Sequence, residues 1–275
     1  MKKRLIAILF IAAGVLGQNA RADVLVLVHG YLSGAQSWDT SGVSTVLRRH
    51  GWRHAGVYVA GPAGVHLMPV PATGKSGNSY YTVDLPSEAP VVVQSFQLRE
   101  MLAAINRSHA DEPVYLVGHS AGGVVARAAL VNGNSVNVRA LITIASPHLG
   151  TYRAEQALDA TDIPFPFSIL TDVFGGSIYD TARRSRSLYV DLVRPRPGTL
   201  LFWLNSQPHP DILYFSIVRG QESVAMGDFV VPGYSQDMNN VPVLKGRSTR
   251  ISIPREHGLD VLDGGVIVNL LAELG

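Results

Sequence analysis

The six residues Gly118-His119-Ser120-Ala121-Gly122-Gly123 constrain the fold of this chain more than any other feature. They directly follow the apolar run Val114 to Val117 and open a helical pattern at residues 124–130. Glycines two residues before and after Ser120 let a strand and a helix pass close together, as a sharp turn between them requires. The pattern therefore predicts that Ser120 stands at the apex of a strained strand-to-helix turn.

Strand and helix patterns alternate along the rest of the chain. Val24 to Val28 is a continuous apolar, β-branched run, which is typical of a strand buried on both faces of a parallel sheet. Further strands are predicted at 57–60, 114–117, 140–145, 212–218 and 249–253, and helices at 91–107, 121–131 and 259–274. This alternation predicts the α/β class, with one domain over 23–275 built on a mostly parallel central sheet that has helices on both faces.

Two long segments interrupt this alternation. Residues 62–90, rich in Pro, Gly, Ser and Tyr, are predicted to be a loop excursion, and residues 147–210 to be a cap or lid insertion. The second segment lies between two predicted strands, so it emerges at the carboxyl ends of the sheet, where ligands bind in open α/β folds. Its apolar run 163–174 fits either substrate contact or ordinary core. The substrate-binding prediction names Phe165, Phe167 and Leu170.

A serine hydroxyl near neutral pH is a poor nucleophile, so it needs an imidazole to take its proton and a carboxylate to orient that imidazole. Downstream of Ser120 the histidine candidates are His148, His209 and His257. Only His257 follows a late predicted strand, precedes the final helix and leaves room upstream for an acid in the chain order serine, acid, histidine. We therefore expect His257 to be the partner of Ser120.

The acid should lie between the strand predicted at 212–218 and the final helix. Glu222, Asp228, Asp237 and Glu256 are the candidates in this interval. Asp228 is best placed, because it lies in a turn and the apolar run that follows would anchor it. The predicted triad is Ser120, Asp228 and His257.

The segments VLVLVHGY, LVGHSAGG, TIASPHLGT and GDFVVP, with the late His257, resemble the α/β-hydrolase superfamily and, within it, bacterial triacylglycerol lipases and related secreted esterases. The resemblance extends from Val24 to the last predicted helix. It implies an α/β-hydrolase fold, the same triad, and a segment at 146–150 like the one after the sixth strand of such lipases. The chain differs in carrying Ala121, where those lipases often have Gln or Met, and in the insertion at 147–210, with which no lid can be aligned.

Attack on a carbonyl also requires two donors for the oxyanion that develops. One should be the backbone N–H of Ala121, directly after the nucleophile, and the other should come from the loop after an early strand. His29-Gly30-Tyr31 ends the run 24–28, so the backbone N–H of Tyr31 is the second predicted donor. The resemblance implies the same two residues.

The first 22 residues have the pattern of an export signal. Basic residues at 2–4, an apolar run from Leu5 to Leu16 and small residues at Ala20 and Ala22 predict a signal peptide cleaved after Ala22. An uncleaved anchor is the alternative, although a dozen apolar residues fall short of the roughly 20 that span a bilayer. We expect export to the periplasm or the extracellular space.

Charge and cysteine content limit the partners. The formal net charge is +2, and four basic residues with no acid lie in the first 22, which leaves −2 for the rest. A chain with so little charge has no global electrostatic reason to bind nucleic acid. The absence of cysteine excludes disulfides and thiolate chemistry. The expected partners are an acyl ester or lipid substrate and, transiently, a lipid surface.

No cofactor or metal site is predicted. His50 and His54 are four residues apart but have no carboxylate beside them. Calcium remains an alternative only because Asp260 resembles, in position, an acid near the calcium site of some bacterial lipases. The predicted function is cleavage of acyl esters through an acyl-enzyme. An acyltransferase or amidase would use the same triad, and a lipid- or partner-binding protein could use the same fold without catalysis.

Overall fold

The computed structural model describes residues 22–61, 64–71, 77–133, 137–161, 180–181, 183–220 and 228–274. The predicted signal segment therefore lies outside the described residues, apart from Ala22. The described strands form one sheet of eight in the order β3-β2-β4-β1-β5-β6-β7-β8. They are β1 (Val24–Val28), β2 (Arg53–Gly61), β3 (Gly64–Met68), β4 (Ser79–Asp84), β5 (Val114–His119), β6 (Val138–Ile144), β7 (Leu213–Arg219) and β8 (Ser248–Ile253).

All neighbouring strands are parallel except β2 and β3, which pair antiparallel at one edge of the sheet. This arrangement confirms the predicted α/β class and the mostly parallel sheet. The central strand β1 is buried along its whole length, as its continuous apolar run predicts. Val24, Val26 and Val28 pack into one core cluster, and Leu25 and Leu27 pack into the other on the opposite face.

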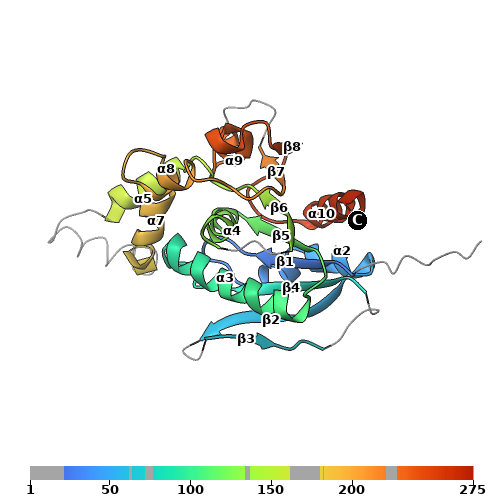
Figure 1. Cartoon of the computed structure of the whole chain (residues 1–275). Helices are drawn as coiled ribbons and strands as arrows, with labels where there is room; N and C mark the ends of the chain where they lie inside the picture. Colours follow the sequence, from blue (N-terminus) through green and yellow to red (C-terminus); the bar gives the residue numbers. More distant parts are fainter. Residues whose placement is uncertain are drawn as a thin grey trace, which may run out of the picture.

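Helices cover both faces (Figure 1). α3 (Val91–Ser108) and α4 (Ala121–Asn132) pack on one face, and α2 (Val43–Arg49) and α10 (Val261–Leu274) on the other. The remaining described helices are α1 (Ser37–Thr40), α5 (Tyr152–Thr161), α7 (Arg186–Leu192), α8 (Leu200–Leu204) and α9 (Gly233–Gln236), with 3-10 turns at Met238–Asn240 and Pro242–Leu244. None of the described helices is long and apolar enough to cross a bilayer.

The prediction of a loop excursion over 62–90 is wrong. This segment contributes β3 and β4, and β4 lies between β1 and β2 inside the sheet. Tyr80, Tyr81 and Val83 of β4 are buried, and aromatic and β-branched residues favour strands. The strand is only six residues long and follows a stretch rich in Gly and Ser. Because such residues are typical of turns, the sequence pattern favoured a loop over a strand here.

The insertion at 147–210 contributes α5, α7 and α8 between β6 and β7. Figure 1 shows these helices together at the left, the side toward which β2 points. The carboxylate of Asp191 in α7 accepts a hydrogen bond from Val91 N at 2.7 Å, and so satisfies a free N–H at the start of α3. Phe165, Phe167 and Leu170 lie outside the described residues.

Candidate active site

The turn between β5 and α4 has the predicted strained geometry. Ser120 has φ 52° and ψ −129°, a left-handed conformation that costs a non-glycine residue energy and persists only where the surroundings enforce it. Two backbone hydrogen bonds hold it: Ser120 N donates to Ile144 O at 2.8 Å, and Gly123 N donates to Ser120 O at 3.1 Å. The side chain therefore projects from a backbone fixed on both sides.

The glycines of this turn are required by close backbone contacts. A Cβ on Gly118 would lie 2.5 Å from Gly123 Cα. A Cβ on Gly122 would overlap the carbonyl oxygen of His29 and lie 2.7 Å from that of Val28. Because these neighbours are backbone atoms, no side-chain rotation can make room. The glycines thus bring the first turn of α4 against the end of β1.

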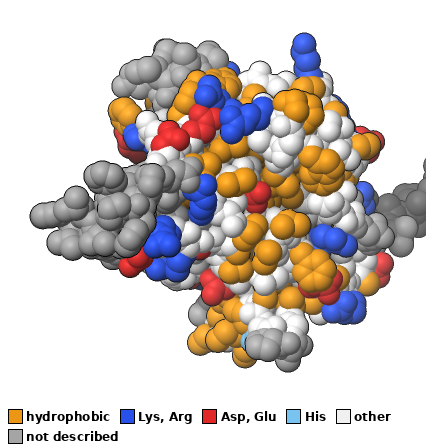
Figure 2. All heavy atoms as spheres, turned by 90° about the vertical axis from the view of Figure 1, so that its left-hand side faces the viewer, with side chains coloured by type: hydrophobic (Ala, Val, Ile, Leu, Met, Phe, Trp, Pro, Cys, Tyr) orange, Lys and Arg blue, Asp and Glu red, His pale blue; other side chains and the backbone are white. Residues whose placement is uncertain are grey.

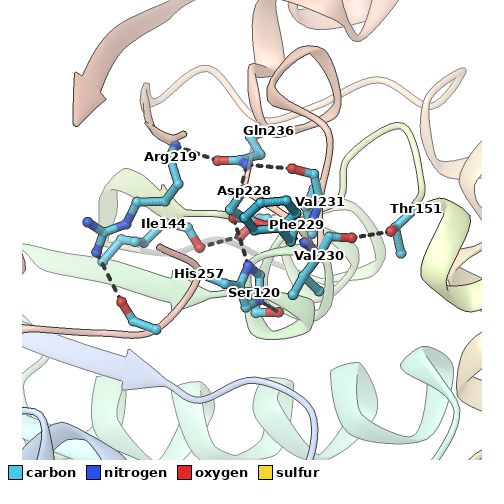
Figure 3. A network of polar contacts seen from close by, with 12 residues as sticks. Ser120, Ile144, Thr151, Arg219, Asp228, Phe229, Val230, Val231, Gln236 and His257 are labelled. Atoms are coloured by element: carbon cyan, nitrogen blue, oxygen red, sulfur yellow. Dashed lines mark hydrogen bonds and ion pairs between the residues drawn. The ribbon is translucent and has the colours of Figure 1, made fainter. Parts of the chain in front are cut away.

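The structure brings the three predicted triad residues together (Figure 3). Ser120 Oγ lies 2.8 Å from His257 Nε2, and His257 Nδ1 lies 2.8 Å from Asp228 Oδ2. The carboxylate can only accept, so Nδ1 carries a proton and Nε2 is free to accept the hydroxyl proton of Ser120. The side chain of Asp228 is buried, whereas that of His257 is 20% exposed. The hydrogen-bond chain can therefore move a proton away from Ser120.

Asp228 is held as an acceptor by several donors. Its Oδ1 accepts hydrogen bonds from Val230 N at 2.8 Å and Val231 N at 2.6 Å. Its Oδ2 accepts from Gln236 Nε2 at 3.2 Å as well as from His257. These donors hold the carboxylate in place beside the imidazole. The contact with Gln236 was not found from the sequence, since no local pattern marks it.

The other acid candidates have different environments. Asp237 is buried, and its Oδ1 accepts a hydrogen bond from Asn239 N at 2.9 Å, so that it caps the 3-10 turn at Met238–Asn240. Glu256 is exposed next to His257, and Glu222 lies outside the described residues. Asp228 is thus the candidate that contacts the imidazole.

His119, the residue before the serine, contacts the backbone of His257. His119 Nε2 donates to the backbone oxygen of His257 at 2.9 Å. Burial, reinforced by the nearby His257, lowers the pKa of His119 to about 3, so it stays neutral at ordinary pH. No role for His119 was predicted from the sequence. Its position inside the glycine motif was the available signal.

His148 and His209, the two rejected histidine candidates, belong to a separate buried cluster. Arg127 of α4 donates a hydrogen bond to Asn205 Oδ1, and Asn205 Nδ2 donates to His148 O at 3.0 Å. Burial lowers the pKa of Arg127 to about 9 and that of His209 to about 4. These side chains join α4 to the insertion and do not contact Ser120.

The predicted oxyanion donors lie in suitable segments. Ala121 is the first residue of α4, where a backbone N–H has no partner within the helix. The loop that carries Tyr31 passes beside the serine, since a Cβ on Gly30 would lie 2.9 Å from Ser120 Cβ. The ring of Tyr31 packs edge-on against Tyr189 of α7, with 5.4 Å between their centroids. The oxyanion role of both N–H groups stays a prediction.

The residues around Asp260 give no support to a calcium site. Asp260 Oδ1 accepts a hydrogen bond from Leu262 N at 2.7 Å, and Arg255 Nε lies 3.7 Å from its Oδ2. The nearby carboxylate of Asp263 is occupied by Arg219. Within the part of the chain that the structure describes, no group of three or more His, Asp or Glu side chains is arranged to hold a metal ion.

Comparison with known proteins agrees with this fold. The family described as a PGAP1-like alpha/beta domain matches residues 73–160, which include Ser120. Among solved structures, the mature lipase BlEst2 of Bacillus licheniformis is similar at 17% identity and a TM-score of 0.53, covering 93% of this chain and 92% of that one. The esterase RhEst1 of Rhodococcus sp. ECU1013 is similar at 14% identity and a TM-score of 0.52, covering 92% of each chain. No curated protein matches this chain. The chain has the α/β-hydrolase fold.

Substitution of glycine by alanine tests the close contacts at the turn. Gly122→Ala should lower the free energy of unfolding by about 1–3 kcal/mol, because the added methyl group meets fixed carbonyl oxygens. Gly265→Ala is the matched control: it lies in α10 with no atom within 4 Å of the added Cβ, and should raise stability by about 0.5–1 kcal/mol. Urea unfolding followed by circular dichroism measures both. Equal effects at the two positions would contradict the proposed contact.

Proposed function

We propose that this chain is a serine hydrolase that cleaves carboxylic esters of acyl substrates through an acyl-enzyme intermediate. The observation that carries the proposal is the continuous hydrogen-bond chain from Asp228 through His257 to Ser120, with the serine on a strained turn. This combination activates a hydroxyl for attack on a carbonyl carbon. The strain and the buried acid have a cost in stability, which supports a chemical role over a purely structural one.

Each reaction step has a residue to perform it. Ser120 Oγ attacks the ester carbonyl carbon while His257 Nε2 takes its proton, and Asp228 stabilises the imidazolium. The negative charge on the carbonyl oxygen is met by the N–H groups of Ala121 and Tyr31. When the C–O bond breaks, His257 returns the proton to the departing alcohol. Water then repeats the sequence, with His257 as base, and releases the carboxylic acid and free Ser120.

The apolar residues around the triad favour an acyl substrate. Phe229, next to the acid, is 79% exposed, and Leu32, next to the predicted donor Tyr31, is 57% exposed with φ 51°. Figure 2 views this side of the molecule and shows hydrophobic side chains in several patches separated by charged ones. A groove of about 540 Å³ adjoins the turn after Asp228, with Phe229, Tyr152 and Tyr234 among its lining. Exposed aromatic and aliphatic side chains of this kind suit a hydrocarbon chain.

We also propose that the insertion at 147–210 acts as the cap over the site. Two contacts at the start of the insertion support this role, because Arg153 Nε of α5 donates to Phe229 O at 3.0 Å and Thr151 Oγ1, just before α5, donates to Val230 O. A third contact comes from α7, where Tyr189 meets Tyr31. Substrate contact by Phe165, Phe167 and Leu170 remains part of this proposal.

The proposal also covers where the protein acts and which molecule accepts the acyl group. The pattern at 1–22 supports a signal peptide and therefore action on esters in the periplasm or outside the cell. The triad would serve an acyltransferase or an amidase equally well, since it fixes the nucleophile and not the acceptor. Water is the acceptor in our proposal, and transient contact with a lipid surface accompanies it.

Hydrolysis of p-nitrophenyl esters of graded chain length, beside a triglyceride emulsion, tests the function directly. Wild-type protein should release p-nitrophenol, and Ser120→Ala should abolish the reaction with the fold intact, because the hydroxyl forms the covalent bond. A serine-directed phosphonate should label Ser120 alone, as determined by peptide mass spectrometry. Substantial activity in Ser120→Ala, or labelling at another serine, would refute the assignment.

Substitution of two aspartates nine residues apart tests which of them acts as the acid of the triad. Asp228→Asn should lower kcat by roughly 10⁴-fold, because the amide no longer holds the required imidazole tautomer. Asp237→Asn is the matched control and should have little effect, since asparagine can accept the same capping hydrogen bond from Asn239 N. Initial-rate kinetics on one ester measure both. The reverse order of effects would transfer the acid role to Asp237.

Removing an exposed apolar side chain beside the acid tests the substrate class. Phe229→Ser should lower kcat/KM for long-chain esters by about tenfold and leave acetate ester hydrolysis nearly unchanged. The reason is that a long acyl chain would cover the phenyl ring, and partial loss of that contact costs about 1.5 kcal/mol. Leu213→Ser, an exposed position at the opposite end of β7, is the control and should change neither rate. Equal losses on short and long esters would show that Phe229 does not contact the acyl chain.

A further inference from the structure

Gln236, the last residue of α9, makes three hydrogen bonds at the acid. Its Nε2 donates to Asp228 Oδ2 at 3.2 Å and to Val231 O at 2.8 Å, and its Oε1 accepts from Arg219 N at 2.6 Å. The residue is 1% exposed, so solvent cannot replace these partners. Figure 3 shows its amide between Arg219 and Asp228.

The orientation of this amide is fixed by its neighbours. The backbone N–H of Arg219 can only donate, so it requires the amide oxygen. The carboxylate of Asp228 and the carbonyl of Val231 can only accept, so both require the amide nitrogen. If the amide were flipped, its NH2 group would face the N–H of Arg219, and its oxygen would face the carboxylate of Asp228 and the carbonyl of Val231. Only one orientation of the amide therefore satisfies all three partners, and in that orientation Gln236 donates to Asp228.

Arg219 in turn is anchored to the loop that carries the histidine. Its Nη2 lies 2.5 Å from both carboxylate oxygens of Asp263 in α10, and donates to Gly258 O at 3.4 Å. Both side chains of this ion pair are fully buried. Asp263 Oδ2 also accepts from Asp260 N at 2.9 Å. A continuous set of contacts thus joins the acid-bearing segment to the residues just after His257.

The two oxygens of Asp228 are held differently. Oδ1 accepts from two backbone N–H groups, which fix its position. Oδ2, the oxygen that faces His257, accepts from one other donor among the described residues, the amide of Gln236. Rotation of the carboxylate about its Cβ–Cγ bond would move Oδ2 out of line with His257 Nδ1. The amide opposes that rotation at Oδ2, in addition to the two backbone donors at Oδ1.

We propose that Gln236 is a positioning residue for the triad: its amide, oriented by Arg219 N, holds Asp228 Oδ2 in line with His257 Nδ1. The inference rests on the proposed function and adds a residue to its machinery. Gln236 touches neither substrate nor reacting atoms, and acts through the direction it gives to the acid.

Gln236→Glu tests the donor with little change of shape. The new carboxylate still accepts from Arg219 N but faces Asp228 Oδ2 with a second negative charge. We expect kcat at pH 8–9 to fall by about 10- to 100-fold with KM nearly unchanged, less than the roughly 10⁴-fold expected for Asp228→Asn. The like charge raises the pKa of the carboxyl pair, so at lower pH a bound proton restores a donor. The ratio of variant to wild-type kcat should therefore rise as the pH is lowered toward 6.

Gln236→Met and Gln207→Glu complete the series. Gln236→Met keeps the volume but loses the three side-chain hydrogen bonds, so its kcat should fall without recovery at low pH. Gln207→Glu introduces the same charge at a partly exposed position after α8, where the amide donates to Trp203 O, and should leave kcat and its pH profile unchanged. The proton NMR signal of His257 Nδ1–H supplies a readout without substrate, and should move upfield or broaden in Gln236→Met.

The outcomes separate this inference from the proposed function. Wild-type protein without esterase activity would refute the proposed function, while the NMR signal would still test the positioning of Asp228. An active wild type, with both Gln236 variants within twofold of its kcat and an unchanged Nδ1–H signal, would refute the inference alone. Lower thermal stability of the variants with unchanged kcat and signal would also refute it, because Gln236 would then be structural only.

Discussion

The contact between the first turn of α4 and the end of β1 is the constraint on which the site depends. Gly122 packs directly against the carbonyl groups of Val28 and His29, and Gly118 against Gly123. This close approach forces Ser120 into its left-handed conformation and directs its side chain to the carboxyl edge of the sheet. The loops after β7 and β8 then bring the acid and the imidazole to the serine, since parallel strands end at the same edge.

Features that depend on local backbone requirements could be predicted from the sequence. The glycines around Ser120 predict the turn, and continuous apolar runs predict β1 and β5, because both effects act between residues close in the chain. β4 was missed because its six residues follow strong turn formers. The N–H group of Val91 is satisfied by Asp191, a hundred residues later, and no pattern near the helix could indicate that partner.

A comparison of Asp228 with Asp237 shows how much of the acid prediction the sequence pattern could supply. Asp228 and Asp237 both lie in turns after β7, and both accept backbone hydrogen bonds through their side chains. The apolar run after Asp228 distinguished them in the sequence, and in the fold that run supplies the N–H groups of Val230 and Val231. The contact of Gln236 depends on how the chain folds between β7 and β8, and that of His119 on how two separate segments meet, so both could be found only in three dimensions.

Charge balance around His257 connects these contacts to the proposed chemistry. When His257 takes the proton of Ser120 it becomes a cation, and any other positive charge nearby would oppose that step. His119 supports the backbone of His257, yet its pKa of about 3 keeps it neutral. Arg219 approaches the same loop with its guanidinium paired to Asp263. Both supports therefore hold the imidazole without an unbalanced positive charge, and in the proposed mechanism Asp228 is the group that stabilises the imidazolium.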